Sequence, residues 1–569
     1  MTQFKKTVLR LSIILILPLF SPAQSTYLPI GSKYDHFLDR MGIIMQDNAD
    51  LNIYTPKPLS RKVAVDATLM ADSLSKFYPY DYNYHFSKVD RYMATDLYMN
   101  NSEWIPASLD TFKSKRPIWH TIYTTPSNFF KVNVKDFFMV IDPVLQLNFS
   151  NQTGNSETVF LNSKGLTLRG LIAKHIGFSS TILDNQERGP DFFQQRVTSS
   201  GYPAVPGAGY YKPFKTTAFD YFDARGYIVF DFLKYFNAQF GYDKNFYGNG
   251  YRSLFLSDYP ASNLFLKINM RIWKLNYQLL YSELINQHQL GDYQYPKKYG
   301  VFHHLSFNAS KWLNLGIFGN IMFSRPDHFE FSYLNPLIFL VPAQQENGSP
   351  DKTTMGLDFK ANVAHVLQFY GQLLFNEFNL HEILDWSNGW WGNKQGLQLG
   401  LKYINVFDIK NLDLQLETNM VRPYTYSHDD TVSNYSHYNQ PMAHPLGSNF
   451  FEFITIANYQ PSPKLIVQAK LIYYKQGTDS GGINYGYNIF ENYNTRPYDY
   501  GFFVGTGLLT KCVNASALIS YEFLNNFFID LSAMYRTFRT EYPTGATTQS
   551  SMTYTIGVRL NAVRRQYDY

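Results

Sequence analysis

The feature that most constrains this fold is a repeated alternation of apolar and polar residues, which starts near Val132 and continues toward the C-terminus. Residues 264–272 and 412–417 show it clearly, and the alternating segments run for about nine to twelve residues each. Side chains of a β-strand alternate between two faces with this period. Strands of soluble proteins have about five or six residues, whereas a tilted strand that crosses a bilayer needs about nine to eleven. The pattern therefore predicts membrane-crossing strands.

The alternating segments often come in pairs joined by short links such as Trp273–Lys274 and Asn525–Asn526. Longer irregular stretches follow many of the pairs, for example 424–449 and 475–500. Short turns at one end and long loops at the other are typical of an up-and-down meander. In lipid, strands must close into a barrel to satisfy their backbone groups. We predict an all-β transmembrane barrel of about eighteen antiparallel strands in residues 131–569.

Composition supports a barrel and excludes several other classes of protein. The 569 residues include 46 Tyr, 47 Phe and 7 Trp, and aromatic girdles are common at both interfaces of transmembrane barrels. Beyond the first 25 residues, no apolar run approaches the length of a membrane-spanning helix. A single cysteine, Cys512, excludes an internal disulfide and a zinc site built on thiolates. The net charge of +5 is not clustered, so we expect no nucleic-acid partner.

The N-terminus predicts export from the cytoplasm. Lys5, Lys6 and Arg10 precede the apolar run Leu11–Phe20, and small residues follow at the expected cleavage site. This is the pattern of a signal peptide, which we assign to residues 1–23. Export together with membrane-crossing strands predicts the outer membrane of a Gram-negative bacterium as the location, with lipid as one partner.

Residues 24–130 are predicted to form a small α-helical module in the periplasm. Tyr34, Phe37, Leu38 and Met41 have helical spacing. A second helix is predicted after Ser60, and a third over 81–100. At the other end of the chain, the terminal aromatic residue is typical of many barrels, although the alternation slips between residues 560 and 569.

No motif of an enzyme or a cofactor site is present, so we expect neither catalysis nor a cofactor. His381 and Glu382 begin like a zinc-protease helix, but Asp385 stands where the second histidine would be. The loop 426–447 carries possible metal ligands in a spacing that matches no known site. We interpret it as a hydrogen-bonded surface loop, with a metal site as the less favoured alternative. The possible ligands are His428, Asp429, Asp430, His437 and His444.

If the apolar residues face lipid, the alternating polar residues face the lumen. Charges of both signs on an inner wall normally form a hydrogen-bonded network, which here predicts a filled lumen. The alternative is a polar conduit or a carbohydrate track. The predicted lumen residues are Lys267, Arg271, Asp358, Lys360, Asp413, Glu417 and Arg559.

Several segments together resemble the Wzi-type family of outer-membrane proteins for capsule assembly, which includes a RemB-like branch associated with gliding motility. The resemblance spans nearly the whole chain after the signal peptide. It rests on Tyr34–Arg40, Lys57–Arg61, Asp142–Gln146, Phe246–Ser257, Phe331–Leu337 and Pro441–Gly447. It implies an eighteen-stranded barrel with a periplasmic helical bundle, and a lectin-like protein that holds polysaccharide on the cell.

We therefore expect a surface protein that binds or helps assemble polysaccharide. Sugars present apolar C–H faces, for which exposed Tyr and Trp side chains are flat partners. The alternatives are a motility or secretion accessory that acts through envelope proteins, and a diffusion channel. The candidate sugar-binding residues in surface loops are Trp386, Trp390, Trp391, Tyr424, Tyr426, Tyr435 and Tyr438.

Overall fold

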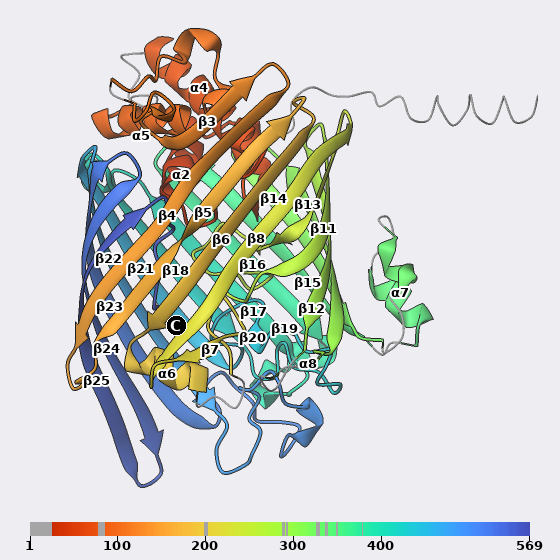
Figure 1. Cartoon of the computed structure of the whole chain (residues 1–569). Coiled ribbons are helices and arrows are strands. Elements are labelled where there is room, and N and C mark those ends of the chain that lie inside the picture. Colours follow the sequence, from red (N-terminus) through yellow and green to blue (C-terminus); the bar gives the residue numbers. More distant parts are fainter. Residues whose placement is uncertain are drawn as a thin grey trace, which may run out of the picture.

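The computed structural model describes residues 25–77, 86–115, 117–198, 203–286, 291, 294–325, 330–335, 340–348, 351–377 and 379–569. Within them, eighteen antiparallel strands pair in sequence order and close into one barrel (Figure 1), which confirms the predicted fold class. The ring consists of β4 (Phe137–Gln152), β5 (Val159–Ile172), β6 (Ile176–Arg188), β8 (Ala218–Leu233), β9 (Phe236–Asp243), β11 (Asn263–Ile272), β12 (Leu275–Ile285), β13 (Lys297–Asn308), β14 (Leu313–Phe323), β15 (Lys352–Val363), β16 (Leu367–Glu377), β17 (Lys394–Tyr403), β18 (Leu412–Val421), β21 (Phe450–Ser462), β22 (Leu465–Thr478), β23 (Leu508–Leu524), β24 (Phe527–Tyr542) and β25 (Gly545–Leu560).

The alternation predicted which faces of the strands meet lipid and lumen. Leu266, Ile317 and Leu357 are exposed on the outside, whereas Lys267 and Asp358 on the opposite faces are buried. The predicted short links are the turns between β11 and β12 and between β23 and β24. They lie at one end of the barrel, which we call the periplasmic end because outer-membrane barrels have short turns on that side. The longer loops lie at the opposite end, which we call the loop end.

The barrel closes between β25 and β4, with pairs that run from Thr553–Gln152 to Leu560–Leu145. The terminal aromatic residue, Tyr569, is not part of the closing strand, because β25 ends at Leu560, where the alternation in the sequence slips. The last nine residues, 561–569, leave the wall and enter the lumen; we call them the tail. Figure 1 marks the C-terminus within the outline of the barrel.

Seven shorter strands of the described residues extend the wall or lie inside it. β2 and β3 form a hairpin on β4, and β7 pairs with β8. Inside, β1 of the N-terminal module pairs with β10 of an inward loop, and β19 pairs with β20. These strands are β1 (Pro56–Lys57), β2 (Ile122–Thr125), β3 (Asn128–Val134), β7 (Lys212–Phe214), β10 (Phe246–Tyr247), β19 (Ser436–His437) and β20 (Gln440–Pro441).

The described part of the N-terminal module contains four α-helices: α2 (Lys33–Met45), α3 (Ala49–Ile53), α4 (Arg61–Phe77) and α5 (Lys88–Asn100). The spacing predicted α2 and α4, and α5 covers the described part of the predicted third helix. Ser87 caps α5, since its side chain accepts the N–H of Asp90 while the Asp90 side chain accepts the N–H of Ser87. The predicted signal peptide lies outside the described residues and stays a prediction.

The remaining helical segments lie mainly in connections between strands. They are α6 (Asp191–Thr198), α7 (Leu340–Glu346), α8 (Leu380–Leu384) and the 3₁₀ turns η2 (Ser102–Trp104), η3 (Ala107–Leu109), η4 (Phe331–Leu334), η5 (Trp386–Asn388), η6 (Val406–Asp408) and η7 (Tyr493–Thr495). Among the described residues, no helix has the length and apolar character needed to cross a membrane.

The module is docked on the periplasmic mouth of the barrel and covers it (Figure 1). Arg40 of α2 donates to Asp413 of β18 at 2.6 Å, and both side chains are buried. Asp39 accepts from Lys402 of β17 at 2.6 Å. Burial alone would raise the pKa of Asp39, but the ammonium groups of Lys402 and Lys57 hold this pKa below its ordinary value.

Candidate functional site

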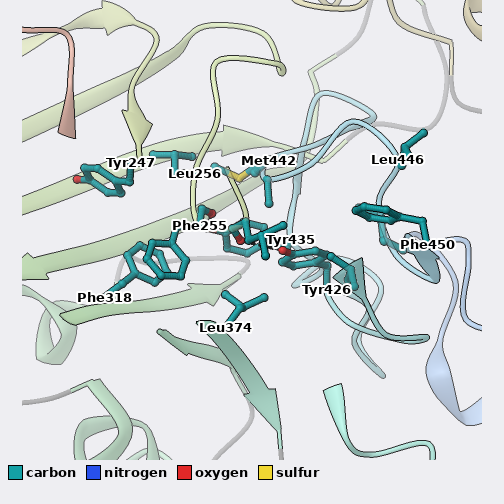
Figure 2. Packing of buried hydrophobic residues seen from close by; sticks show 14 of the residues in the cluster. Tyr247, Phe255, Leu256, Phe318, Leu374, Tyr426, Tyr435, Met442, Leu446 and Phe450 are labelled. Carbon is teal, nitrogen blue, oxygen red and sulfur yellow. Dashed lines mark hydrogen bonds between the residues drawn. The ribbon is translucent and has the colours of Figure 1, made fainter. Parts of the chain in front are cut away.

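The loop-end half of the lumen is filled by two loops that fold inward, 244–262 and 422–449. Figure 2 shows their aromatic side chains packed together with residues of the wall. Phe255 stacks on Phe318 of β14 with ring centroids 4.5 Å apart, and Tyr426 stacks on Tyr435 at 5.4 Å. The inner wall is therefore apolar here, and the rule that apolar residues face lipid fails in this half of the barrel.

The structure buries four of the predicted sugar-binding residues. Tyr424, Tyr426 and Tyr435 are at most 1% exposed, and Tyr438 is 6% exposed. The hydroxyls of Tyr424 and Tyr426 donate to the carbonyls of Asn484 and Leu254, at 2.7 and 2.8 Å. The prediction that these rings are exposed is wrong, because they hold the inward loops against the wall instead.

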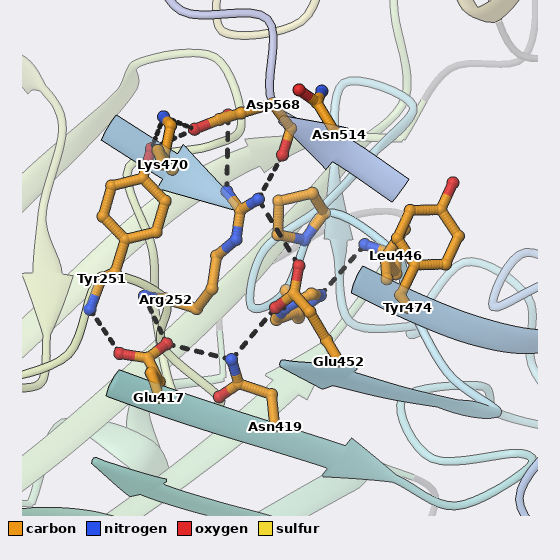
Figure 3. A network of polar contacts seen from close by, with 12 residues as sticks. Tyr251, Arg252, Glu417, Asn419, Leu446, Glu452, Lys470, Tyr474, Asn514 and Asp568 are labelled. Carbon is orange, nitrogen blue, oxygen red and sulfur yellow. Dashed lines mark hydrogen bonds and ion pairs between the residues drawn. The ribbon is translucent and has the colours of Figure 1, made fainter. Parts of the chain in front are cut away.

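A buried polar network lies next to this apolar cluster and joins loop, wall and tail (Figure 3). Glu452 of β21 accepts from Asn419 at 3.0 Å and pairs with His444 at 2.7 Å. Arg252, from the other inward loop, lies 3.6 Å from the same carboxylate. Hydrogen bonds and ion pairs to Glu452 thus join three segments of the chain, at residues 252, 419 and 444–452.

The tail is anchored in the lumen through its own charged side chains. Asp568 lies 2.6 Å from the Nζ of Lys470 and also contacts Arg252 and Tyr251. Nearer the strand end, Arg565 pairs with Glu187 of β6 at 3.0 Å. These contacts bury the tail as part of the barrel interior.

Most of the seven predicted lumen residues contact inserted segments, so the seven do not form one network of the wall. Lys267 donates to Asn245 at 3.0 Å, and Lys360 donates to the carbonyl of Leu51 at 2.8 Å. Arg271 pairs with Asp50 of α3. The inner wall is thus matched to the loops and the module as well as to itself.

The other four predicted lumen residues have partners both in the wall and in inserted segments. Asp358 pairs with His304 at 2.8 Å and Arg559 with Asp530 at 2.7 Å, both between wall strands. Asp413 holds Arg40 of the module, as described above. Glu417 accepts the backbone N–H groups of the inward loop at Tyr251 and Arg252, 2.6 and 3.0 Å away.

At the loop end, two loops form an exposed aromatic surface, which we call the aromatic face. Trp390 and Trp391, both predicted, are half-buried there with ring centroids 6.0 Å apart. Tyr498 and Tyr500 are 46% and 51% exposed. The side chain of the remaining predicted residue, Trp386, lies outside the described part of the structure.

Hydrogen bonds to the backbone fix the two loops of the aromatic face relative to each other. Backbone hydrogen bonds join its two loops, including Trp391 N–H to Asp499 O at 2.9 Å. Arg422 donates to the carbonyls of Trp390 and Phe502, at 3.2 and 3.1 Å. Arg496 lies 3.8 Å from the ring centroid of Trp391, which orients that ring.

Sequence reasoning did not place Tyr498 and Tyr500 in the site. They lie between β22 and β23, in the segment Tyr498-Asp499-Tyr500, and none of the seven predicted sugar-binding residues comes from that loop. Pro497 and Asp499 disfavour a strand at this position, so the sequence indicates a loop that carries two tyrosines. This pattern could have identified them as candidate surface residues.

The possible metal ligands of the loop 426–447 are dispersed. His437 accepts the N–H of Ile285 at 3.0 Å, and His444 contacts Glu452. Burial, together with the Lys352 ammonium, lowers the pKa of His428. Within the described residues, no three His, Cys, Asp or Glu side chains come together as a metal site.

No protein-family model matches the chain, and no curated protein matches its sequence. Among solved structures, the chain is similar to Wzi of Escherichia coli, an outer-membrane protein involved in group 1 capsule assembly and a carbohydrate-binding β-barrel. The two share 12% identity with a TM-score of 0.56, over 95% of this chain and 100% of Wzi.

Two other solved structures give lower scores. OprD of Pseudomonas aeruginosa shares 11% identity, with a TM-score of 0.41 over 74% of this chain and 95% of OprD. OccAB2 of Acinetobacter baumannii shares 9%, with a TM-score of 0.39 over 74% and 98%. The closed barrel implies the outer membrane of a Gram-negative bacterium, and the comparison with Wzi shows that this chain shares the fold of that barrel.

Proposed function

We propose that this protein binds or helps assemble polysaccharide at the cell surface, in a non-catalytic role. The observation that carries the proposal is the aromatic face, where Trp390, Trp391, Tyr498 and Tyr500 are presented together at the loop end. Aromatic rings pack against the apolar C–H faces of sugars, and neighbouring amide and carboxylate groups bond sugar hydroxyls.

Polar groups of the right kind flank the rings. Asp385, Asn388 and Asp499 are exposed beside them. The hydroxyl of Tyr500 donates to Glu382 at 3.3 Å, which fixes its ring at the surface. The fold shared with Wzi, a carbohydrate-binding barrel, supports the same proposal.

The filled lumen favours surface binding over diffusion. Both inward loops, the tail and the module occupy the space through which a solute would pass. A polysaccharide would thus meet the protein at its loop end rather than inside it.

The test is binding of the purified full chain to extracellular polysaccharide from the cells that express it. Replacing Tyr498 and Tyr500 by Ser removes two exposed rings without opening the core. We expect each of these substitutions to weaken polysaccharide binding by about 1 kcal/mol, which is roughly five-fold in affinity. Tyr542→Ser is the matched control, since Tyr542 is 46% exposed on the β24–β25 hairpin, outside the aromatic face.

Two results would contradict the proposal: no binding by the unmodified protein, or equal losses in the Tyr542 variant. Capture of an envelope protein by crosslinking, without any glycan binding, would favour the alternative role as a motility or secretion accessory.

A further inference from the structure

Three cationic side chains form a row across neighbouring strands of the barrel wall. Lys475 of β22 lies directly opposite Lys511 of β23, which in turn lies directly opposite Arg539 of β24. Residues directly opposite each other in an antiparallel sheet share a face, and their Cβ atoms are about 5 Å apart. The Cβ atoms of all three residues therefore lie within about 10 Å. We call this set the cationic row.

The cationic row lies on the lipid-facing side of the wall. Residues an even number apart along a strand share a face. Leu471 and Tyr535 each lie four residues from a member of the row, and they are 41% and 43% exposed. Gln476 and Thr510, which are next to members of the row in the sequence, are buried in the lumen. The three cations thus project outward.

The position of the row along the strands places it at the outer boundary of the membrane. On β23, the exposed Tyr521 lies ten residues from Lys511 toward the periplasmic end. Ten residues of strand extend about 33 Å, which at a tilt of about 40° covers about 25 Å, the usual height of the apolar band. On β25, the outward residues change from Tyr554 to the polar Ser550 and Thr548, and Thr548 lies opposite the row. The row therefore lies at the level of the outer headgroups.

The cationic row carries more positive charge than its surroundings neutralise. Glu541 lies 2.9 Å from the Nζ of Lys511 and 3.5 Å from the Nε of Arg539, so one carboxylate serves two cations. Lys475 has no carboxylate partner among the residues that the structure describes, and its Nζ lies 5.8 Å from the ring centroid of Phe451. Like charges directly opposite each other destabilise a sheet. An external anion would relieve this excess.

A phosphate group suits the cationic row, because arginine binds phosphate through paired hydrogen bonds and lysine binds it as a point charge. The outer leaflet of a Gram-negative outer membrane is rich in glycolipid, whose lipid A anchor carries phosphate at headgroup level. We propose that the cationic row binds a phosphate group of lipid A, with the acyl chains against the apolar band that includes Leu471. This site is separate from the aromatic face and does not depend on the proposed function.

The probe is diphosphoryl lipid A, compared with the same lipid A after chemical removal of its phosphates. Native mass spectrometry of the detergent-solubilised full chain should show binding of the first and much weaker binding of the second. Lys511→Gln and Arg539→Gln should each weaken binding of the phosphorylated lipid by about five-fold, the effect of one cation at an anionic membrane surface. Glu541→Gln removes the competing carboxylate and should strengthen this binding.

Lys464→Gln is the matched control, because Lys464 is exposed in the turn between β21 and β22, at the periplasmic end of the same part of the wall. It should bind lipid A like the unmodified protein. Inorganic phosphate at millimolar concentration should not displace the lipid, whose acyl chains add apolar contacts. Migration of unheated protein in SDS gels confirms that each variant is folded.

Four results would overturn the proposal. They are equal binding of the dephosphorylated lipid, no binding of lipid A by the unmodified chain, equal losses in Lys464→Gln and the row variants, and displacement of the lipid by inorganic phosphate. The last result would assign the cationic row to free phosphate instead.

Discussion

Single tyrosine side chains both fill this lumen and satisfy backbone carbonyls buried within it. Tyr426 and Tyr435 each donate to a carbonyl of the inward loop 244–262, at 2.8 and 2.5 Å. Leucine would fill the space but leave those carbonyls without a partner, at a cost of about 1–3 kcal/mol each. The abundance of tyrosine therefore has two causes here, interfacial girdles outside and loop packing inside.

One loop carboxyl makes local stability depend on pH. Asp479 follows β22, and its carboxylate accepts the N–H groups of Tyr485 and Asn488 at 2.6 and 3.3 Å. Burial nevertheless raises the pKa of Asp479 from 3.8 to about 6. The folded loop therefore binds the proton of the Asp479 carboxyl more tightly than the unfolded loop does. The stability that this protonation adds is fully present below pH 3.8 and is lost as the pH rises through about 6.

We expect residues 479–491 to open more readily at pH 7 than at pH 5. Hydrogen exchange measured by mass spectrometry, corrected for the intrinsic pH dependence of exchange, should show lower protection at pH 7. Asp479→Asn should remove this difference, whereas Asp499→Asn, at an exposed position, should leave it unchanged. Greater protection at pH 7 in the unmodified protein would contradict the expected sign.

Among the elements, the tail stabilises the barrel without closing it. Asp568 joins the buried cations Lys470 and Arg252, and its removal leaves them without that carboxylate. We expect Asp568→Asn to lower the free energy of unfolding by about 3–5 kcal/mol, as for other broken buried ion pairs. Deletion of residues 561–569 should lower the thermal midpoint but still give a closed barrel, since the β25–β4 pairs end at Leu560.

Circular dichroism measures the midpoint, and migration of unheated protein in SDS gels reports closure. Glu541→Gln breaks an exposed pair with Lys511 and should change stability by less than about 0.5 kcal/mol. Failure of the truncated chain to close would show that the tail takes part in assembly instead.

The strands could be predicted from the sequence and the packing of the loops could not. Period-two alternation fixes strand existence, length and outward face, as in β11 and β15. On the inner wall, Phe302 of β13 and Phe318 of β14 are covered by an inward loop. These two strands therefore carry apolar side chains on both faces. Alternation carries no information about which loop covers a wall, and an aromatic loop such as 424–449 is equally compatible with exposure or burial.

On the scale of the whole molecule, the lumen is filled from both ends. The helical module covers the periplasmic mouth, the two inward loops pack the loop-end half, and the tail lies between them. The interior thus combines two apolar cores with polar networks, which resembles a packed domain more than a pore. The surface available to an external ligand is therefore formed by the exposed loops at the loop end.

A filled lumen predicts that the protein does not conduct ions. In planar bilayers, the unmodified chain should show no steady single-channel current, because the buried cluster around Phe255, Tyr426 and Tyr435 fills the loop-end half of the lumen. Replacing residues 425–446 by a short Gly-Ser linker removes much of that cluster and should produce current. The control is a shortened hairpin at 543–548, which is exposed and lies outside the lumen. This variant should show no current, like the unmodified protein. A steady current through the unmodified chain would instead mean that the inward loops leave the lumen under these conditions, and it would favour the diffusion channel over surface binding.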